Sequence, residues 1–409
     1  MVTTELNLDY LSPEFLENPY PTFAKLRAES PVVWDSKFHT GFSSGVGAWH
    51  IFKYADIQSI LRDRQISSEM PPLELERYPA EAREIISQLF SITQKSILFS
   101  DPPKHTRLRS LVSKTFTTQI IEGMGLQIQE NVNSLLDNWQ NTQEIEFIEN
   151  FAEILPVNVL SDLIGFPRKD YETINNWVKN EVEFLGGSPV SLELMYQSRT
   201  EFLNYIQEQI LQHRQHLRKD LLSDLIMAQE EGYYLSDEEL QGMIWLLLNA
   251  GYETTVNAIG NSIFLLLKYP EQLKLLRENL SLVETAVEET LRYEAPVQFI
   301  HRLAKNDFEL QGNLIKAGQD IYAWLASANH DPDQFSESES LNITRPNNQH
   351  FGFGTGIHLC LGAALARLQI KISIKSILQR FPEFHLRTGG YKGKPSAIAR
   401  GLKYLWLVF

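Results

Sequence analysis

The only cysteine of the 409-residue chain lies in a glycine-rich stretch, FGTGIHLCLG at residues 353–362. A strong helix-forming run, AALARLQI, follows at residues 363–370, so Cys360 precedes a helix N-terminus whose amides and dipole stabilise a thiolate. Glycines let this backbone approach a flat ligand closely. The alternatives are a cysteine acting as a small buried hydrophobe and a dinucleotide-binding loop, whose first-third-sixth glycine spacing is not met here. The stretch therefore predicts a thiolate that binds a metal.

The same stretch resembles the haem-binding loop of the cytochrome P-450 haem-thiolate monooxygenases, in which Phe, Gly, Cys and Gly recur at fixed spacing. Phe353, Gly356, Cys360 and Gly362 fit that pattern. The resemblance implies a haem b cofactor with Cys360 as the axial ligand of the iron. It also implies a mainly α-helical fold with a small β-rich lobe, with the haem between a long central helix and the helix after the cysteine. Because the family's motifs follow in order along nearly the whole chain, we expect one haem domain over residues 1–409.

A capping box at residues 236–239 predicts the start of the longest helix, which can run to Tyr269, on the order of 50 Å at 1.5 Å per residue. Its apolar middle carries Ala250, Glu253 and Thr254. Thr254 shares a face with Ala250, and its hydroxyl can bond the carbonyl one turn back or a ligand. An interior carboxylate such as Glu253 costs several kcal/mol unless it is partnered, which argues against simple helix packing. By resemblance, Glu253 and Thr254 relay protons to dioxygen and Ala250 lies beside the haem.

A pair of basic residues, His105 and Arg109, lies four residues apart on a helix predicted to begin at Lys104. One helix face can therefore offer both side chains to neighbouring anionic groups. A basic surface helix is the alternative. The resemblance assigns the two residues to the haem propionates, together with Arg302 and His358.

Glu289 and Arg292 lie three residues apart on a predicted helix, a spacing that allows an ion pair. If exposed, such a pair would contribute little to stability. The family has a Glu-x-x-Arg motif in this place, so the resemblance implies a structural ion pair joined by Arg345. Residues 341–344 lack the aromatic and acidic residues of the family pattern before that arginine.

Composition restricts the class of protein and its location. A formal charge of −14 argues against nucleic-acid binding and against a basic membrane-surface protein. One cysteine excludes an internal disulfide framework and fits a cytoplasmic protein. The first residues show no signal sequence, and the most apolar segment, residues 244–267, carries Glu253 and three asparagines. We therefore expect neither a membrane anchor nor a transmembrane helix.

Substrate contacts are expected on the central helix, on the extended segment after residue 296 and at a hairpin tip near residue 398. The candidates are Leu246, Leu247, Asn249, Val297, Gln298, Phe299 and Ile398. They predict a mainly hydrophobic secondary metabolite with a few polar groups, either free or tethered to a carrier protein. Asn249 could bind the substrate or face the protein interior. We also expect a loop region over residues 66–99, and a break at residues 186–189 that by resemblance is the lid over the substrate.

The expected reaction inserts one oxygen atom of O2 into the substrate. The sequence has no flavin or iron–sulfur domain, so the electrons should come from ferredoxin and a ferredoxin reductase. Basic residues on two helices could dock an acidic ferredoxin; they are Lys104, Arg107, Arg109 and Lys114, and Arg367, Lys371 and Lys375. One alternative is a haem-thiolate enzyme that catalyses oxidative coupling or rearrangement. A second is a peroxide-driven enzyme, which would not need Glu253 and Thr254. A third is a haem sensor, which would show no partner-dependent oxygen consumption.

Overall fold

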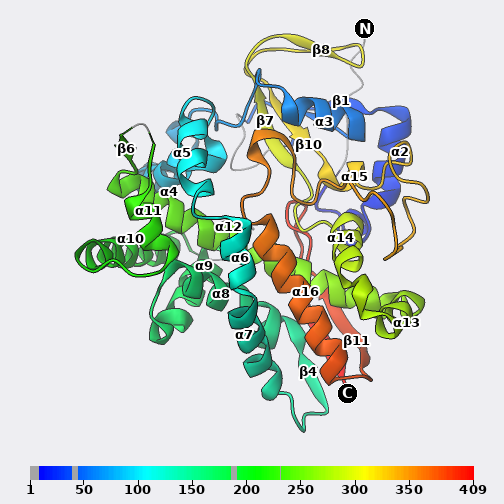
Figure 1. Cartoon of the computed structure of the whole chain (residues 1–409). Coiled ribbons are helices and arrows are strands. Elements are labelled where there is room, and N and C mark those ends of the chain that lie inside the picture. Colours follow the sequence, from blue (N-terminus) through cyan, green and yellow to red (C-terminus); the bar gives the residue numbers. More distant parts are fainter. Residues whose placement is uncertain (1–8, 39–44, 186–190, 231) are drawn as a thin grey trace. The chain divides into compact units, whose positions relative to one another are not determined.

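The computed structural model describes residues 9–38, 45–185, 191–230 and 232–409. The chain is mainly helical with small sheets, as predicted (Figure 1). It forms two compact units: the first holds Met1–Ser67, Val132–Glu153 and Thr254–Phe409, and the second holds Ser68–Asn131 and Ile154–Glu253. That both units belong to one haem domain stays a prediction.

The first unit contains the larger sheet. Its helices and strands are α1 (Pro13–Glu17), α2 (Tyr20–Glu29), β1 (Val32–Asp35), β2 (Ala48–Ile51), α3 (Tyr54–Arg62), β3 (Ile66–Ser67), β4 (Glu144–Glu146), the π-helix η4 (Ile148–Ala152), α13 (Pro270–Glu278), the 3₁₀ helix η6 (Leu280–Leu282), α14 (Val283–Tyr293), β7 (Ile300–Ala304), β8 (Phe308–Leu310), β9 (Asn313–Ile315), β10 (Asp320–Ala323), α15 (Leu325–Ala328), the 3₁₀ helix η7 (Gly356–His358), α16 (Ala363–Arg380), β11 (His385–Gly393) and β12 (Leu402–Val408).

The second unit is almost entirely helical. Its elements are the 3₁₀ helices η1 (Leu75–Arg77), η2 (Ala80–Ala82), η3 (Ile97–Phe99) and η5 (Arg168–Asp170), the helices α4 (Arg83–Lys95), α5 (Lys104–Ser113), α6 (Thr118–Gly123), α8 (Ile154–Ile164), α9 (Tyr171–Leu185), α10 (Leu192–Gln215) and α11 (Leu221–Met227), and the short strands β5 (Gln229–Glu230) and β6 (Tyr233–Tyr234). The chain passes between the two units within α7 (Gly125–Asp137) and α12 (Asp237–Lys268).

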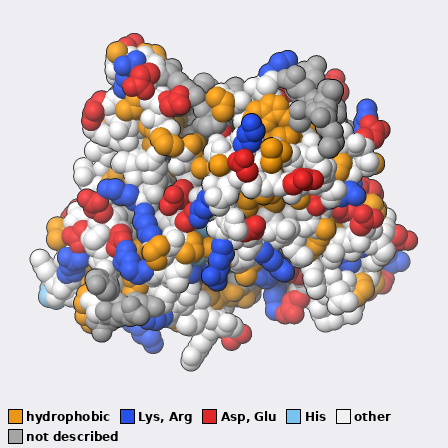
Figure 2. Space-filling model, turned by 90° about the horizontal axis from the view of Figure 1, so that it is seen from above, with side chains coloured by type: hydrophobic (Ala, Val, Ile, Leu, Met, Phe, Trp, Pro, Cys, Tyr) orange, Lys and Arg blue, Asp and Glu red, His pale blue; other side chains and the backbone are white. Residues whose placement is uncertain are grey.

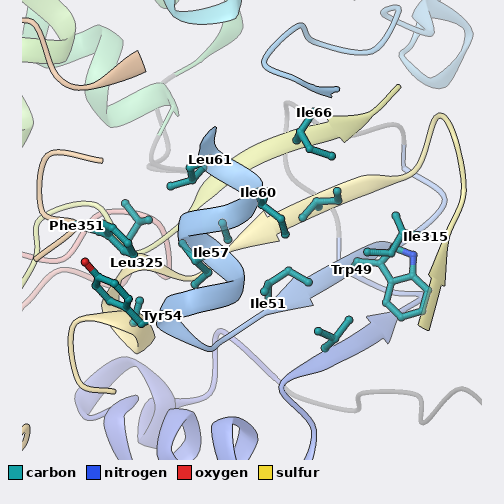
Figure 3. Packing of buried hydrophobic residues seen from close by; sticks show 14 of the residues in the cluster. Trp49, Ile51, Tyr54, Ile57, Ile60, Leu61, Ile66, Ile315, Leu325 and Phe351 are labelled. Carbon is teal, nitrogen blue, oxygen red and sulfur yellow. The ribbon is translucent and has the colours of Figure 1, made fainter. Parts of the chain in front are cut away.

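The five-stranded sheet has the order β1-β2-β10-β7-β3, with β2 and β10 parallel and the other pairs antiparallel. Because side chains alternate between the faces of a strand, Trp49 and Ile51 of β2 point to one face. There they form a buried cluster with Ile57 and Ile60 of α3 and with Phe351 (Figure 3). This packing fixes α3 against the sheet, close to the segment that leads to Cys360.

Helix α12 begins with the predicted capping box. The Ser236 amide donates to the Glu239 carboxylate over 3.0 Å, and the Glu239 amide donates to the Ser236 hydroxyl over 3.2 Å. The helix ends at Lys268, one residue before the expected limit. Its 32 residues span about 48 Å at 1.5 Å per residue. Among the described residues, no helix is long and apolar enough to cross a membrane.

The expectation of a loop over residues 66–99 is wrong for its second half, which forms α4. Ile86, Leu89 and Ile92 are buried there at intervals of three residues, so one apolar face holds the helix in the second unit. The expected break at residues 186–189 lies outside the described residues. Figure 2 shows basic and acidic side chains interspersed with apolar ones over the face in view, although the total charge is −14.

Candidate functional site

Cys360 lies in a tight loop directly before α16. The amide of Cys360 donates to the carbonyl of Phe353 over 3.0 Å, and the amide of Leu359 donates to the carbonyl of Gly356 over 3.2 Å. These bonds close the loop around the short helix η7 and bring both ends of the FGTGIHLCLG stretch together. The thiol of Cys360 is exposed, three residues before the first residue of α16. The geometry therefore presents the thiol at a helix N-terminus, where a thiolate is stabilised.

Helix α3 packs against the cysteine loop and against the segment that leads into it. The rings of Tyr54 and Phe351 stack with centroids 4.2 Å apart, and the Tyr54 hydroxyl donates to the Gln349 carbonyl over 2.8 Å. Gly356 has φ +75°, and a Cβ there would lie 2.3 Å from the carbonyl oxygen of Leu61. Only glycine fits such a backbone conformation and approach, which explains the glycine at this place of the motif.

A charged clamp from α14 and α16 holds the other side of the loop. The Arg367 guanidinium lies 4.3 Å from the ring centroid of Phe353 and donates to both oxygens of Glu288 over 2.7 and 2.8 Å. His350 Nε2 lies 3.1 Å from the same carboxylate. Burial works to raise the pKa of Glu288, but the hydrogen bonds from Arg367 and His350 outweigh it and lower the pKa to about 2. Glu288 is thus ionised at neutral pH, and its pairing with Arg367 fixes the guanidinium against Phe353, the first residue of the motif.

The residues of the loop fit haem. A thiolate is one of the ligands that hold haem iron, and the thiol is flanked by exposed apolar side chains, with Ile357 41% and Leu359 47% exposed, which suit the flat apolar face of a porphyrin. Among the described residues, no group of three or more His, Cys, Asp and Glu side chains could hold a bare metal ion. A single thiolate supplies only one ligand. It therefore suits an iron whose other ligands come from a porphyrin, and not a bare metal ion.

The predicted ion pair of α14 is present, and Arg345 joins it. Glu289 and Arg292 are both 0% exposed and Arg345 is 9% exposed. Arg292 donates to Glu289 over 2.8 and 2.9 Å, and Arg345 Nε lies 3.0 Å from Glu289 Oε2. Arg292 also donates to the carbonyls of Asn329 and Ser338, each over 2.8 Å. The cluster thereby fixes the irregular segment that leads into the cysteine loop.

The remaining candidates in the first unit lie on or near the larger sheet. Arg302 of β7 is 6% exposed, and one of its guanidinium nitrogens donates to the His301 carbonyl over 2.7 Å. Gln298 is paired with Ile398 through its main-chain amide, at 2.9 Å, while its side-chain nitrogen donates to the Ala295 carbonyl over 2.7 Å. The side-chain nitrogen of Gln298 therefore already has a partner within the protein.

The apolar candidates of the same unit differ in exposure. Phe299 is 6% exposed and belongs to an aromatic cluster, against which the partly buried Ile398 packs. Val297 forms a β-bridge with Ala399 and is half-buried. Val297 and Ile398 are therefore the more accessible of these three side chains.

In the second unit, α5 carries both predicted propionate residues. His105 is 3% exposed and Arg109 is half-buried. Burial and the positive charge of Arg109 lower the pKa of His105, against a smaller opposite effect of Asp101. His105 is therefore neutral at pH 7 and can serve as a neutral N–H donor, while Arg109 supplies charge.

The middle of α12 has one accessible face. Ala250 is exposed and Leu247 and Thr254 are half-buried, at the spacing of one side of a helix. A Cβ at Gly251 would lie 2.9 Å from Leu160 Cδ1 of α8, so the glycine lets α8 approach closely. Glu253 is half-buried beside this accessible face. The helix therefore offers a small residue, a hydroxyl and a carboxylate together.

The expected basic helix faces are partly neutralised. Arg107 is bonded to Glu239 within the second unit, and in the first unit Arg367 is bonded to Glu288 and Lys371 to Glu284. At least three of the seven basic residues proposed for docking thus have carboxylate partners. Sequence reasoning missed these partners because they lie on other elements.

The chain resembles known proteins over almost its whole length. The Cytochrome P450 family profile matches residues 189–392. The chain is 35% identical over 385 residues to Cytochrome P450 CYP107DY1 of Priestia megaterium, covering 92% of each chain. It is 35% identical over 396 residues to the Polyketide biosynthesis cytochrome P450 PksS of Bacillus subtilis, covering 96% of each.

Among solved structures, P450BioI in complex with a hexadec-9Z-enoic acid ligated acyl carrier protein is 34% identical, with TM-score 0.86, over 97% of this chain and 99% of that one. The fold and the cysteine loop define a haem-thiolate protein. The chain belongs to the cytochrome P450 family. It is accordingly a haem-dependent monooxygenase that uses O2.

Proposed function

We propose that the chain oxidises a mainly hydrophobic small molecule of secondary metabolism, either free or tethered to a carrier protein, with electrons from ferredoxin and ferredoxin reductase. The observation that carries this proposal is the accessible apolar face of α12, with Leu247, Ala250 and Thr254. Two relatives support the substrate class: PksS is described as a polyketide biosynthesis enzyme, and the P450BioI structure holds an acyl chain on a carrier protein.

The side chains have separate roles in the proposed reaction. Bound haem would activate O2, so that one oxygen atom enters the substrate and the other leaves as water. The Cys360 thiolate would ligate the iron and donate electron density. His105, Arg109, Arg302 and His358 would hold the propionates through hydrogen bonds strengthened by charge. Glu253 and Thr254 would move protons from solvent into the site, a role typically worth about 10²- to 10⁴-fold in rate.

The substrate class can be tested by a spectral titration of the purified ferric protein. We expect a saturable low-spin to high-spin shift of the Soret band with an apolar ligand drawn from fatty acids, terpenoids, indoles, cyclic dipeptides and macrolides. A shift only with acyl groups on a carrier protein would select the tethered form. A protein that holds haem and responds to none of these ligands, free or tethered, would contradict the proposed substrate class.

Thr254→Ala should separate electron consumption from product formation. The variant keeps the helix, because alanine is the best helix former, but it removes the hydroxyl that would steer protons. We expect haem and substrate affinity to stay unchanged, product per electron pair to fall at least about tenfold, and hydrogen peroxide to account for the difference. Product yield, peroxide and oxygen consumption are measured in parallel.

The matched control for this prediction is Thr255→Ala, which removes the neighbouring hydroxyl from a side chain that is 3% exposed. It should leave product formation coupled to electron consumption. Equal coupling in Thr254→Ala and in the control would remove Thr254 from the proton path.

Electron transfer from ferredoxin should weaken with salt. Lys104 and Lys375 are exposed and remain candidates for docking an acidic partner. Charge steering raises association rates by about 10- to 10³-fold, and salt removes this effect because it shortens the Debye length. Since several of the basic residues are already paired, we expect the rate of haem reduction to fall by an amount near the lower end of this range, about tenfold. Stopped-flow reduction of the haem at increasing ionic strength measures this, and a rate independent of salt would contradict ferredoxin docking by charge.

A further inference from the structure

Asn249 has a fixed amide orientation on α12. Its Nδ2 donates to the Trp245 carbonyl one turn earlier, over 2.8 Å. A carbonyl oxygen only accepts hydrogen bonds, so the nitrogen of the amide must face Trp245 and Oδ1 must point away from it. Asn249 is 9% exposed, and Oδ1 has no hydrogen-bond partner within the part of the chain that the structure describes.

A buried carbonyl oxygen without a donor loses the hydrogen bonds it would make in water and gains none in return. The cation that lies over the Trp245 ring already has other partners. Arg199 of α10 is 5% exposed and is bonded to Glu181 of α9 and to the Leu89 carbonyl of α4. Its guanidinium lies over the Trp245 ring, 5.2 Å from the centroid. The positive charge over the Trp245 ring is therefore already paired with the Glu181 carboxylate.

Asn249 directly precedes a residue of the accessible face of the helix. Leu246 is 9% exposed, Leu247 is half-buried and Ala250 is exposed. One turn later Glu253 adds a carboxylate that is half-buried. A ligand group that donates a hydrogen bond suits Oδ1, whereas an ionised carboxylate, which only accepts hydrogen bonds, does not.

We propose that Oδ1 of Asn249 accepts a hydrogen bond from the substrate, so that the substrate carries a hydroxyl or an amide N–H where it lies against α12. This inference rests on the proposed function, because it concerns a ligand of the same monooxygenase. It narrows the substrate class to neutral apolar molecules with a hydrogen-bond donor and excludes a free carboxylate at this position.

A matched set of ligands tests the inference on the haem-loaded protein. Myristyl alcohol and myristamide carry a donor, myristyl methyl ether carries only an acceptor, and myristate carries an anion on the same chain. We expect the alcohol and the amide to bind roughly threefold to tenfold more tightly than the ether, because one hydrogen bond contributes about 0.5–1.5 kcal/mol net. Dissociation constants come from the Soret spin-state shift.

Two substitutions at the same position sharpen the test. Asn249→Leu keeps the approximate size but removes the acceptor, so the alcohol and the ether should bind equally. Asn249→Asp is the conservative control: in its protonated form, which burial favours, the O–H can donate to the Trp245 carbonyl and the remaining oxygen can accept. The preference for donors should therefore persist in Asn249→Asp, and the thermal unfolding midpoint of both variants checks that they fold.

The outcomes separate this inference from the proposed function. If the wild-type protein prefers the alcohol and Asn249→Leu does not, the inference holds. Equal affinities for alcohol and ether in the wild type, or a preference that survives in Asn249→Leu, would overturn it and leave Oδ1 to an internal water. A protein that binds no haem would instead overturn the proposed function.

Discussion

Cys360→Ser is expected to reduce monooxygenase turnover to background while the protein stays folded. The Cys360 side chain is exposed, so its packing contributes little, and serine is a close isostere. A serine hydroxyl is not ionised at neutral pH and cannot replace the electron donation of a thiolate to haem iron. The loss should therefore come from chemistry rather than from unfolding.

The measurement is the Soret band of the reduced carbon monoxide complex, which reports thiolate ligation, together with product formation. Circular dichroism should show the helical content of the wild type. Leu126→Ser, at a side chain that is 81% exposed, serves as the control and should keep both the thiolate spectrum and activity. A Cys360→Ser protein that retained the thiolate-type spectrum and full turnover would show that another group ligates the iron.

The features that the sequence predicted well are those whose chemistry is local. The capping box at residues 236–239 and the start of α5 at Lys104 depend on side chains within one helical turn. The Glu289–Arg292 pair is also a spacing of three residues on one helix. Such features depend on residues within one turn of a helix, so the sequence alone is enough to predict them.

The contacts that positioned the loop could not be predicted, because they join residues far apart in the sequence. Glu288 binds Arg367, 79 residues later, and Tyr54 binds the carbonyl of Gln349, 295 residues later. No local pattern indicates such partners. Helix α4 is a different case, because Ile86, Leu89 and Ile92 mark one apolar face. The helical periodicity is short, and the prolines and charged residues that precede it in the sequence favour the prediction of a loop.

The orientation of a side-chain amide group also cannot be predicted from the sequence. Asn249 was a candidate for either a substrate contact or an interior residue, and the answer depends on which of its two polar atoms is satisfied. Only the bond to the Trp245 carbonyl shows that the nitrogen is used and the oxygen is not. The nitrogen of Gln298 likewise donates to a carbonyl, that of Ala295, but its side-chain oxygen is not a buried atom without a hydrogen-bond partner, so Gln298 gives no comparable signal.

Glu289→Gln is expected to lower the free energy of unfolding by about 3–5 kcal/mol, the typical cost of removing one partner from a buried ion pair. Glu289 accepts hydrogen bonds from Arg292, Arg345, the Asn342 amide and the Asn348 side chain. A glutamine offers one acceptor oxygen and turns an N–H₂ group towards these donors. It also leaves two arginines, 0% and 9% exposed, without their anion.

Urea-induced unfolding, followed in parallel by circular dichroism and by the Soret band, measures this loss. The matched control is Glu284→Gln on the same helix, since the Glu284–Lys371 pair has side chains that are 71% and 38% exposed and exposed pairs contribute about 0–1 kcal/mol. Because the Glu289 cluster anchors the segment leading to Cys360, haem should also be released at a lower urea concentration in Glu289→Gln. A loss no greater than that of Glu284→Gln would mean that water or a rearranged carbonyl compensates the two buried cations, and that the cluster does not anchor the cysteine loop.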